Sequence, residues 1–155
     1  MTETTDTAEL RLERAFAAPA AEVFEAWTSP EVLRRWWAAA PGWETPSAEV
    51  DLREGGRYRL SMKDPESGDE HTVGGEYREV SPPTRLVYTW SWEGDPEEMA
   101  GSADSVVTVE FHERDGTTNV VVTHEGFASD QIRDMHVHGW EACIANLSSR
   151  VLTPA

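Results

Sequence analysis

Three of the five histidines of the chain fall within one short stretch, HEGFASDQIRDMHVHGW, at positions 124–140. Imidazole serves readily as a metal ligand and as an acid or base near neutral pH, so these residues are the first candidates for chemistry. What His124, His136 and His138 can do depends on which of them face the same space. That in turn depends on the strands and helices that hold them.

A shared metal ion is the first possibility, and the spacing argues against it. Residues 129–152 have helical periodicity, and on a helix His136 and His138 point roughly 200° apart. They therefore cannot bind one ion together. The sequence has no Cys/His cluster with zinc spacing, no HExxH motif and no glycine-rich phosphate loop. We expect neither a metal site nor a cofactor.

His124 belongs to a predicted hairpin that fixes its direction. The Asp-Gly pair at 115–116 is a strong signal for a two-residue turn between residues 105–114 and 117–127. A turn there pairs Val107 with His124 and places both on the inward, apolar face of the hairpin. The same register points His112 toward water.

His136 lies on the apolar stripe of the predicted C-terminal helix, with Trp140, Cys143 and Leu147. His124 and His136 are thus expected to face each other, either as half-buried structural histidines or as polar anchors or an acid/base pair at a ligand site. No GxSxG motif is present and no serine is predicted beside either histidine, so a Ser-His-Asp site is not indicated. Cys143 is expected to be buried and inert.

The elements that position these residues follow from periodicity and turn signals. One strand covers 10–16, and short helices cover 19–29 and 31–39, the second with Ser29 as its cap. Further strands alternate through residues 47–92, where Val50 and Leu52 are expected to share a face. Because strands follow each other through short turns, we predict an α+β fold: a curved antiparallel sheet of about seven strands covered by one long C-terminal helix.

Large rings and apolar side chains crowd the predicted inner face. Any one of them can be ordinary core, but together they exceed what a small core needs, and their N–H and O–H groups require partners. We therefore expect an apolar cavity between sheet and helix. The candidate ligand-contact residues are Trp36, Trp37, Tyr58, Leu60, Met62, Tyr77, Tyr88, Trp90, Trp92, His124, Phe127, His136 and Trp140.

Composition narrows the class of protein. The 155 residues suit one domain over 8–152 after a disordered tail at 1–7. A formal net charge of −16 repels phosphate backbones and disfavours nucleic-acid binding. No apolar run approaches the roughly 18 residues of a membrane helix, so membrane insertion is not expected. The single cysteine and the absence of a signal peptide lead us to expect a cytoplasmic protein.

Several segments together resemble one family along residues 8–152. They are RAFAAPAAEVFEAWTSPEVLRRWW, DLREGGRY, GEYREVSPPTRLVYTW, VTVEF, THEGF and RDMHVHGW. The chain resembles the START-like (SRPBCC) superfamily, in the branch named after the activator of Hsp90 ATPase. The resemblance implies a helix-grip fold, also called Bet v 1-like, with an apolar cavity between sheet and long helix. Members of the superfamily include polyketide aromatase/cyclases, lipid and hormone binders, and a resistance protein against enediyne antibiotics.

Three functions remain open at this point. The first is binding of a small hydrophobic, aromatic or polyketide-like molecule, as a carrier, sequestering protein, or resistance or biosynthetic accessory protein. The second is a cyclase or aromatase in which His124 or His136 is the base and Tyr58 or Tyr88 the donor. The third is an interaction domain like that of an Hsp90 activator. The sequence assigns no catalytic residue.

Overall fold

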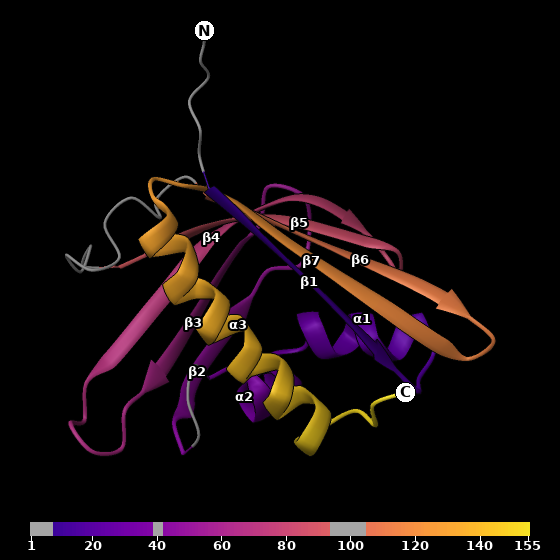
Figure 1. Ribbon diagram of the computed structural model, residues 1–155, viewed down its shortest axis with the longest axis horizontal. Coiled ribbons are helices and arrows are strands. Elements are labelled where there is room, and N and C mark those ends of the chain that lie inside the picture. The colour runs from indigo at the N-terminus through magenta and orange to yellow at the C-terminus, as the bar shows by residue number, and fades with distance from the viewer. Residues whose placement is uncertain (1–7, 39–41, 94–104) are drawn as a thin grey trace, which may run out of the picture.

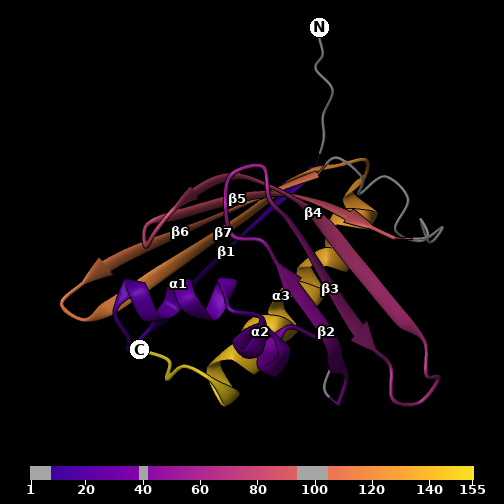
Figure 2. The same ribbon diagram turned by 180° about the vertical axis from the view of Figure 1, so that it is seen from behind.

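The computed structural model describes residues 8–38, 42–93 and 105–155. They form one curved antiparallel sheet, and the long helix α3 lies across the face toward which the sheet curls (Figure 1). The two short helices lie under the same arch (Figure 2). The elements are β1 (Ala8–Phe16), α1 (Ala20–Thr28), α2 (Pro30–Trp36), β2 (Glu44–Val50), β3 (Arg57–Lys63), β4 (Glu70–Ser81), β5 (Arg85–Trp92), β6 (Ser105–Arg114), β7 (Thr117–Phe127) and α3 (Asp130–Arg150).

The predicted α+β helix-grip arrangement is confirmed. The strands have the order β1-β7-β6-β5-β4-β3-β2, and every neighbouring pair is antiparallel. No helix in the described ranges is long and apolar enough to cross a membrane. The tail predicted at 1–7 lies outside the described residues.

The predicted register of the β6–β7 hairpin is also confirmed. Asp115 and Gly116 have φ angles of 54° and 79°, which is the left-handed backbone that a tight two-residue hairpin turn requires. Val107 lies opposite His124, and both side chains are buried. The alternation on β7 therefore points His124 into the space under the sheet.

Helix α2 and strand β2 have bounds that differ from those predicted. Helix α2 stops at Trp36 rather than at residue 39, and Ser29 stands at its N-cap position without a side-chain cap bond. Strand β2 begins at Glu44 and ends at Val50, where a turn over 51–56 takes over. Leu52 lies in this turn and is 39% exposed, so the expectation that it shares a strand face with Val50 was wrong.

Side-chain donors hold the short helices in place. The carbonyl of Ala26 has no helical partner because Pro30, four residues on, lacks an N–H. The indole Nε1 of Trp36 donates to that carbonyl at 2.9 Å. From α3, Asn146 Nδ2 donates to the carbonyl of Trp36 at 3.2 Å. The end of α2 is thus fixed to both α1 and α3.

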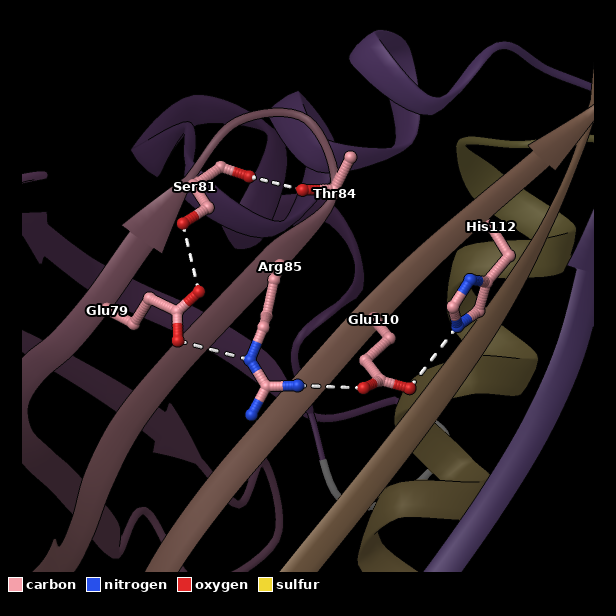
Figure 3. Close-up of polar contacts among 6 residues, drawn as sticks. All are labelled: Glu79, Ser81, Thr84, Arg85, Glu110 and His112. Carbon is pink, nitrogen blue, oxygen red and sulfur yellow. Dashed lines mark hydrogen bonds and ion pairs between the residues drawn. The ribbon is translucent and has the colours of Figure 1, made fainter.

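The outer face of the sheet is polar (Figure 3). Arg85 lies between Glu79 and Glu110, with N–O distances of 3.1 and 2.8 Å, and His112 Nε2 is 3.2 Å from Glu110. Ser81 donates to Glu79 at 2.9 Å. These side chains are at least one-third exposed or lie at the surface, so their ion pairs add little stability. His112 points outward as predicted, and the chemistry-bearing residues lie on the opposite face.

Candidate functional site

Six ring side chains gather between the sheet and α3, and we call them the aromatic–histidine cluster. They come from β5, β7 and α3. Their ring centroids lie 4.3–6.3 Å from their neighbours within the set. The members are Trp90, Trp92, His124, Phe127, His136 and Trp140.

Local sequence explains how each strand presents its ring. Alternation along β5 turns Trp90 and Trp92 to the same face. On β7, Gly126 has a φ of 100°, a backbone that favours glycine, and it is skipped in the pairing with β1. This bulge lets His124 and Phe127 both point inward, and their rings lie 4.3 Å apart. A regular strand would turn one of the two outward.

Helix α3 supplies the other side of the cluster. His136 and Trp140 are four residues apart, so they lie on one face of the helix. Both are buried, whereas His138 is exposed. The rings of His124 and His136 face each other at 5.5 Å, as the two independent periodicities predicted.

His136 is held as a neutral imidazole. Its Nδ1 lies 2.9 Å from the carbonyl of Ile132, an acceptor, so Nδ1 carries the proton. Its Nε2 then accepts from the indole Nε1 of Trp92 at 3.0 Å. Burial lowers the pKa of His136, and the bond to the Ile132 carbonyl opposes this in part. Neither nitrogen is left free.

His124 is neutral with the opposite tautomer. The indole Nε1 of Trp140 donates to its Nδ1 at 3.1 Å, so Nε2 carries the proton and donates to Ser105 Oγ at 2.9 Å. The Ser105 hydroxyl in turn donates a hydrogen bond to the carbonyl of Trp90 at 3.2 Å. Burial, with a smaller effect of His136, lowers the pKa of His124 well below its usual value.

Ser105 corrects one expectation from the sequence, which placed no serine beside either histidine. The hairpin register contained the signal: Val107 opposes His124, and Ser105 lies two residues back on the same face of β6. Ser105 and His124 are nonetheless not arranged as a nucleophile and its general base. His124 Nε2 donates to Ser105, so it cannot accept the proton of the hydroxyl in this arrangement.

Trp90 has a buried polar atom without a partner. Its ring is 4% exposed and lies at the centre of the cluster, 5.1 Å from His124 and 5.7 Å from Trp140. Its Nε1 makes no hydrogen bond to any described residue. An unpaired buried N–H costs about 1–3 kcal/mol, and native proteins rarely keep one without a reason.

A second group of predicted residues forms a tyrosine layer beside the cluster. Tyr58, Tyr77 and Tyr88 pack with centroid distances of 5.1–6.0 Å. Burial raises the pKa of all three phenols, so they stay protonated. A cavity of about 20 Å³ lies here, enough for one water molecule. Its lining is Trp27, Leu33, Trp37, Val50, Tyr58, Leu60, Tyr77 and Tyr88.

The remaining candidates lie at different distances from the cluster. Trp37 borders the cluster, with its ring centroid 6.2 Å from that of Trp90 and 6.4 Å from that of Trp92. Met62 is buried on β3. Trp36 packs on Trp27 at 4.8 Å and caps α1, which gives it a structural role. Periodicity alone could not tell ligand-contact residues from structural ones, because these side chains are all apolar and all point inward.

Comparison with known protein families identifies the family of this chain. The family description "Activator of Hsp90 ATPase homolog 1-like protein" fits residues 17–151. The chain belongs to this family. Its fold agrees with the START-like superfamily that the sequence resembles. No protein among the curated sequences matches the chain.

Several solved structures align with nearly the whole chain. Protein CV1439 from Chromobacterium violaceum is 26% identical, with a TM-score of 0.79 over 91% of this chain and 94% of that one. The AHSA1 protein from Silicibacter pomeroyi is 26% identical, with a TM-score of 0.78 over 92% and 96%. PFC0360w, an HSP90 activator from Plasmodium falciparum, is 25% identical, with a TM-score of 0.69 over 91% and 94%.

Proposed function

We propose that the chain binds a small, mainly apolar molecule between the sheet and α3, at the aromatic–histidine cluster. The observation that carries the proposal is the Nε1 of Trp90 at the centre of the rings, which no residue in the described part of the chain accepts from. A ligand with a carbonyl or hydroxyl oxygen there gains a hydrogen bond, while its rings stack on the surrounding indoles. Aromatic ketones and polyketide-like molecules have this combination.

The cavity in the adjoining tyrosine layer holds only about 20 Å³, whereas a drug-sized molecule needs roughly 300 Å³ or more. A ligand at the aromatic–histidine cluster must therefore displace rings to enter. Trp92 is the member of the cluster best placed to move. It is half-buried, and one hydrogen bond, to His136, holds its indole. Its displacement frees His136 Nε2 as a second polar anchor for the ligand.

The histidines support binding over acid–base catalysis. A general base needs a free lone pair, and both lone pairs are occupied by indole N–H groups, from Trp92 and Trp140. The proposed role is therefore a carrier or sequestering protein, of the kind used in resistance or biosynthesis. A cyclase or aromatase would require a substrate that displaces one of these indoles before reaction.

The test is a matched pair of compounds, the bicyclic ketone 1-tetralone and the hydrocarbon tetralin, followed by quenching of tryptophan fluorescence. We expect saturable binding of both and tighter binding of the ketone, by about 2- to 12-fold for one net hydrogen bond. Mass spectrometry of the mixture then checks the compound. An unchanged mass supports a binding protein; a new product mass contradicts it in favour of an enzyme.

A second candidate is an interaction domain like that of an Hsp90 activator. It is favoured by the family and by the likeness to the Plasmodium protein described as an HSP90 activator. Purified Hsp90 with its ATPase rate as the readout distinguishes the two. Stimulation by the full chain, unchanged in Trp90→Phe, would support this function over ligand binding.

A further inference from the structure

An open groove of about 650 Å³ lies where helix α2, strand β2 and the end of α3 meet, on residues that the ligand site does not use. We propose that this groove binds a small organic anion: a molecule that joins a phosphate or carboxylate group to an apolar ring. Figure 2 shows α2 between β2 and the last turns of α3. The lining is Glu31, Arg34, Arg35, Trp43, Glu44, Thr45, Pro46, Lys63 and Arg150.

The groove collects positive charge in an acidic protein. Four of the chain's 13 basic residues line it, with two glutamates, so its lining carries a formal charge of 4 − 2 = +2. The whole chain carries −16. The basic residues come from three separate elements: Arg34 and Arg35 from α2, Lys63 from the end of β3, and Arg150 from the end of α3.

The four basic side chains are not tied up in ion pairs within the described ranges 8–38, 42–93 and 105–155. None of the four side chains forms an ion pair there, whereas Arg59 pairs with Glu93 and Arg85 pairs with two glutamates. An incoming anion therefore need not break an existing carboxylate pair. It meets side chains whose charge is still available for a hydrogen bond.

Backbone carbonyls orient the guanidinium groups without neutralising them. Arg35 donates to the carbonyl of Arg150 at 2.7 Å, and Arg150 donates to the carbonyl of Arg35 at 3.4 Å. Both carbonyls lie at helix C-termini, where a cation is favoured, and this accounts for these two residues structurally. It does not account for Lys63, or for Arg34, which reaches only the carbonyl of Thr45 at 3.4 Å.

The apolar part of the ligand meets Trp43 and Pro46. Trp43 is held by a parallel stack on His71, with ring centroids 5.9 Å apart and planes 16° apart. The volume lies within the roughly 300–1,000 Å³ typical of small-molecule sites. A polyanion such as nucleic acid extends beyond the groove over a strongly acidic surface, so the net charge favours a compact ligand.

The experiment uses the full chain and three probes: phenyl phosphate, inorganic phosphate and benzyl alcohol. Binding is followed by NMR at the Trp43 indole N–H at low salt. We expect saturable shifts, tightest for phenyl phosphate, and an affinity about fivefold weaker in Arg34→Gln. Arg57→Gln is the matched control, because Arg57 is exposed, lies outside the groove and has no ion pair with a described residue. It should bind as the wild type does.

Three results would overturn the proposal: no saturable shift with phenyl phosphate, equal weakening in Arg34→Gln and Arg57→Gln, or benzyl alcohol binding as tightly as phenyl phosphate. Equal weakening in the two variants would mean that the anion is attracted by surface charge in general and not by the groove. Benzoate, used in a parallel titration, tells whether the site prefers phosphate or carboxylate.

Discussion

Burial lowers the pKa of each inward histidine, and the neutral ring then accepts a hydrogen bond from a tryptophan. Trp92 and Trp140 direct their N–H groups at one nitrogen of His136 and His124 respectively, and this fixes the tautomers. Trp90 lies between them with the same donor, which has no partner among the described residues. The three indoles thus differ in what their Nε1 meets, and this difference can be tested one residue at a time.

Two buried tryptophans make a matched pair for stability. Trp36→Phe removes the donor that satisfies the Ala26 carbonyl, whereas Trp90→Phe removes a donor that has no described partner. Both changes lose similar ring volume. We expect Trp36→Phe to lower the free energy of unfolding by about 1–3 kcal/mol more than Trp90→Phe, as measured by urea denaturation. Equal losses would mean that Trp90 Nε1 is already satisfied in the free protein.

The single cysteine, Cys143, is expected to be unreactive in the folded protein. Burial raises the pKa of its thiol to about 12, and its Sγ lies 3.3 Å from the carbonyl of Ala38. The thiolate is the reactive form, so the native protein should react with a disulfide reagent only as fast as it unfolds. Rapid labelling of native protein, at the rate seen in urea, would show that the thiol is accessible and not the inert core residue expected from the sequence.

At the level of helices and strands, local sequence patterns were enough to predict the direction of some side chains but not of others. The Asp-Gly turn fixed the hairpin register and the direction of His124, and helical spacing fixed that of His136. The bulge at Gly126 that turns Phe127 inward depends on how β7 pairs with β1. The position of Ser105 beside His124 depends on the β6–β7 pairing beyond Val107. The end of α2 depends on tertiary donors such as Trp36, which no local pattern reveals.

Helix capping separates two serines that look alike in sequence. Ser129 Oγ accepts from the N–H of Ile132 at 3.2 Å at the start of α3, whereas Ser29 makes no such bond at α2. Ser129→Ala should therefore lower the free energy of unfolding by about 1 kcal/mol, and Ser29→Ala by much less. Denaturation of both variants checks this; a larger loss in Ser29→Ala would contradict the assigned caps.

At the scale of the whole molecule, the sequence predicted the layers but not the volume between them. The antiparallel sheet and its covering helix follow from alternation and turn signals, whereas the pairing of β1 with β7 joins distant segments that no local pattern connects. The space left between sheet and α3 depends on how rings such as Tyr58, Tyr88 and Trp90 interlock, which the sequence does not specify. The candidate residues therefore divide into a cluster, a tyrosine layer and structural core such as Trp36.

The buried histidines should make stability fall in acid. Their pKa values are lowered in the folded protein, so below about pH 6.5 the unfolded chain binds protons that the native state does not. Stability is lost as pH falls through that value, with each histidine adding up to about 1.4 kcal/mol per pH unit. His136→Gln should show a shallower slope between pH 7.5 and 5.5, with exposed His138→Gln as the substitution control. An unchanged slope in His136→Gln would contradict the neutral assignment.

The central claim, that Trp90 Nε1 marks a ligand site, is tested most directly by one set of titrations. The affinities of 1-tetralone and tetralin are measured in the wild type, Trp90→Phe and the control Trp36→Phe. We predict that the ketone's advantage disappears in Trp90→Phe and persists in Trp36→Phe, because only Trp90 donates to the ketone oxygen. Failure of either compound to bind, or an advantage that survives in Trp90→Phe, would contradict the claim.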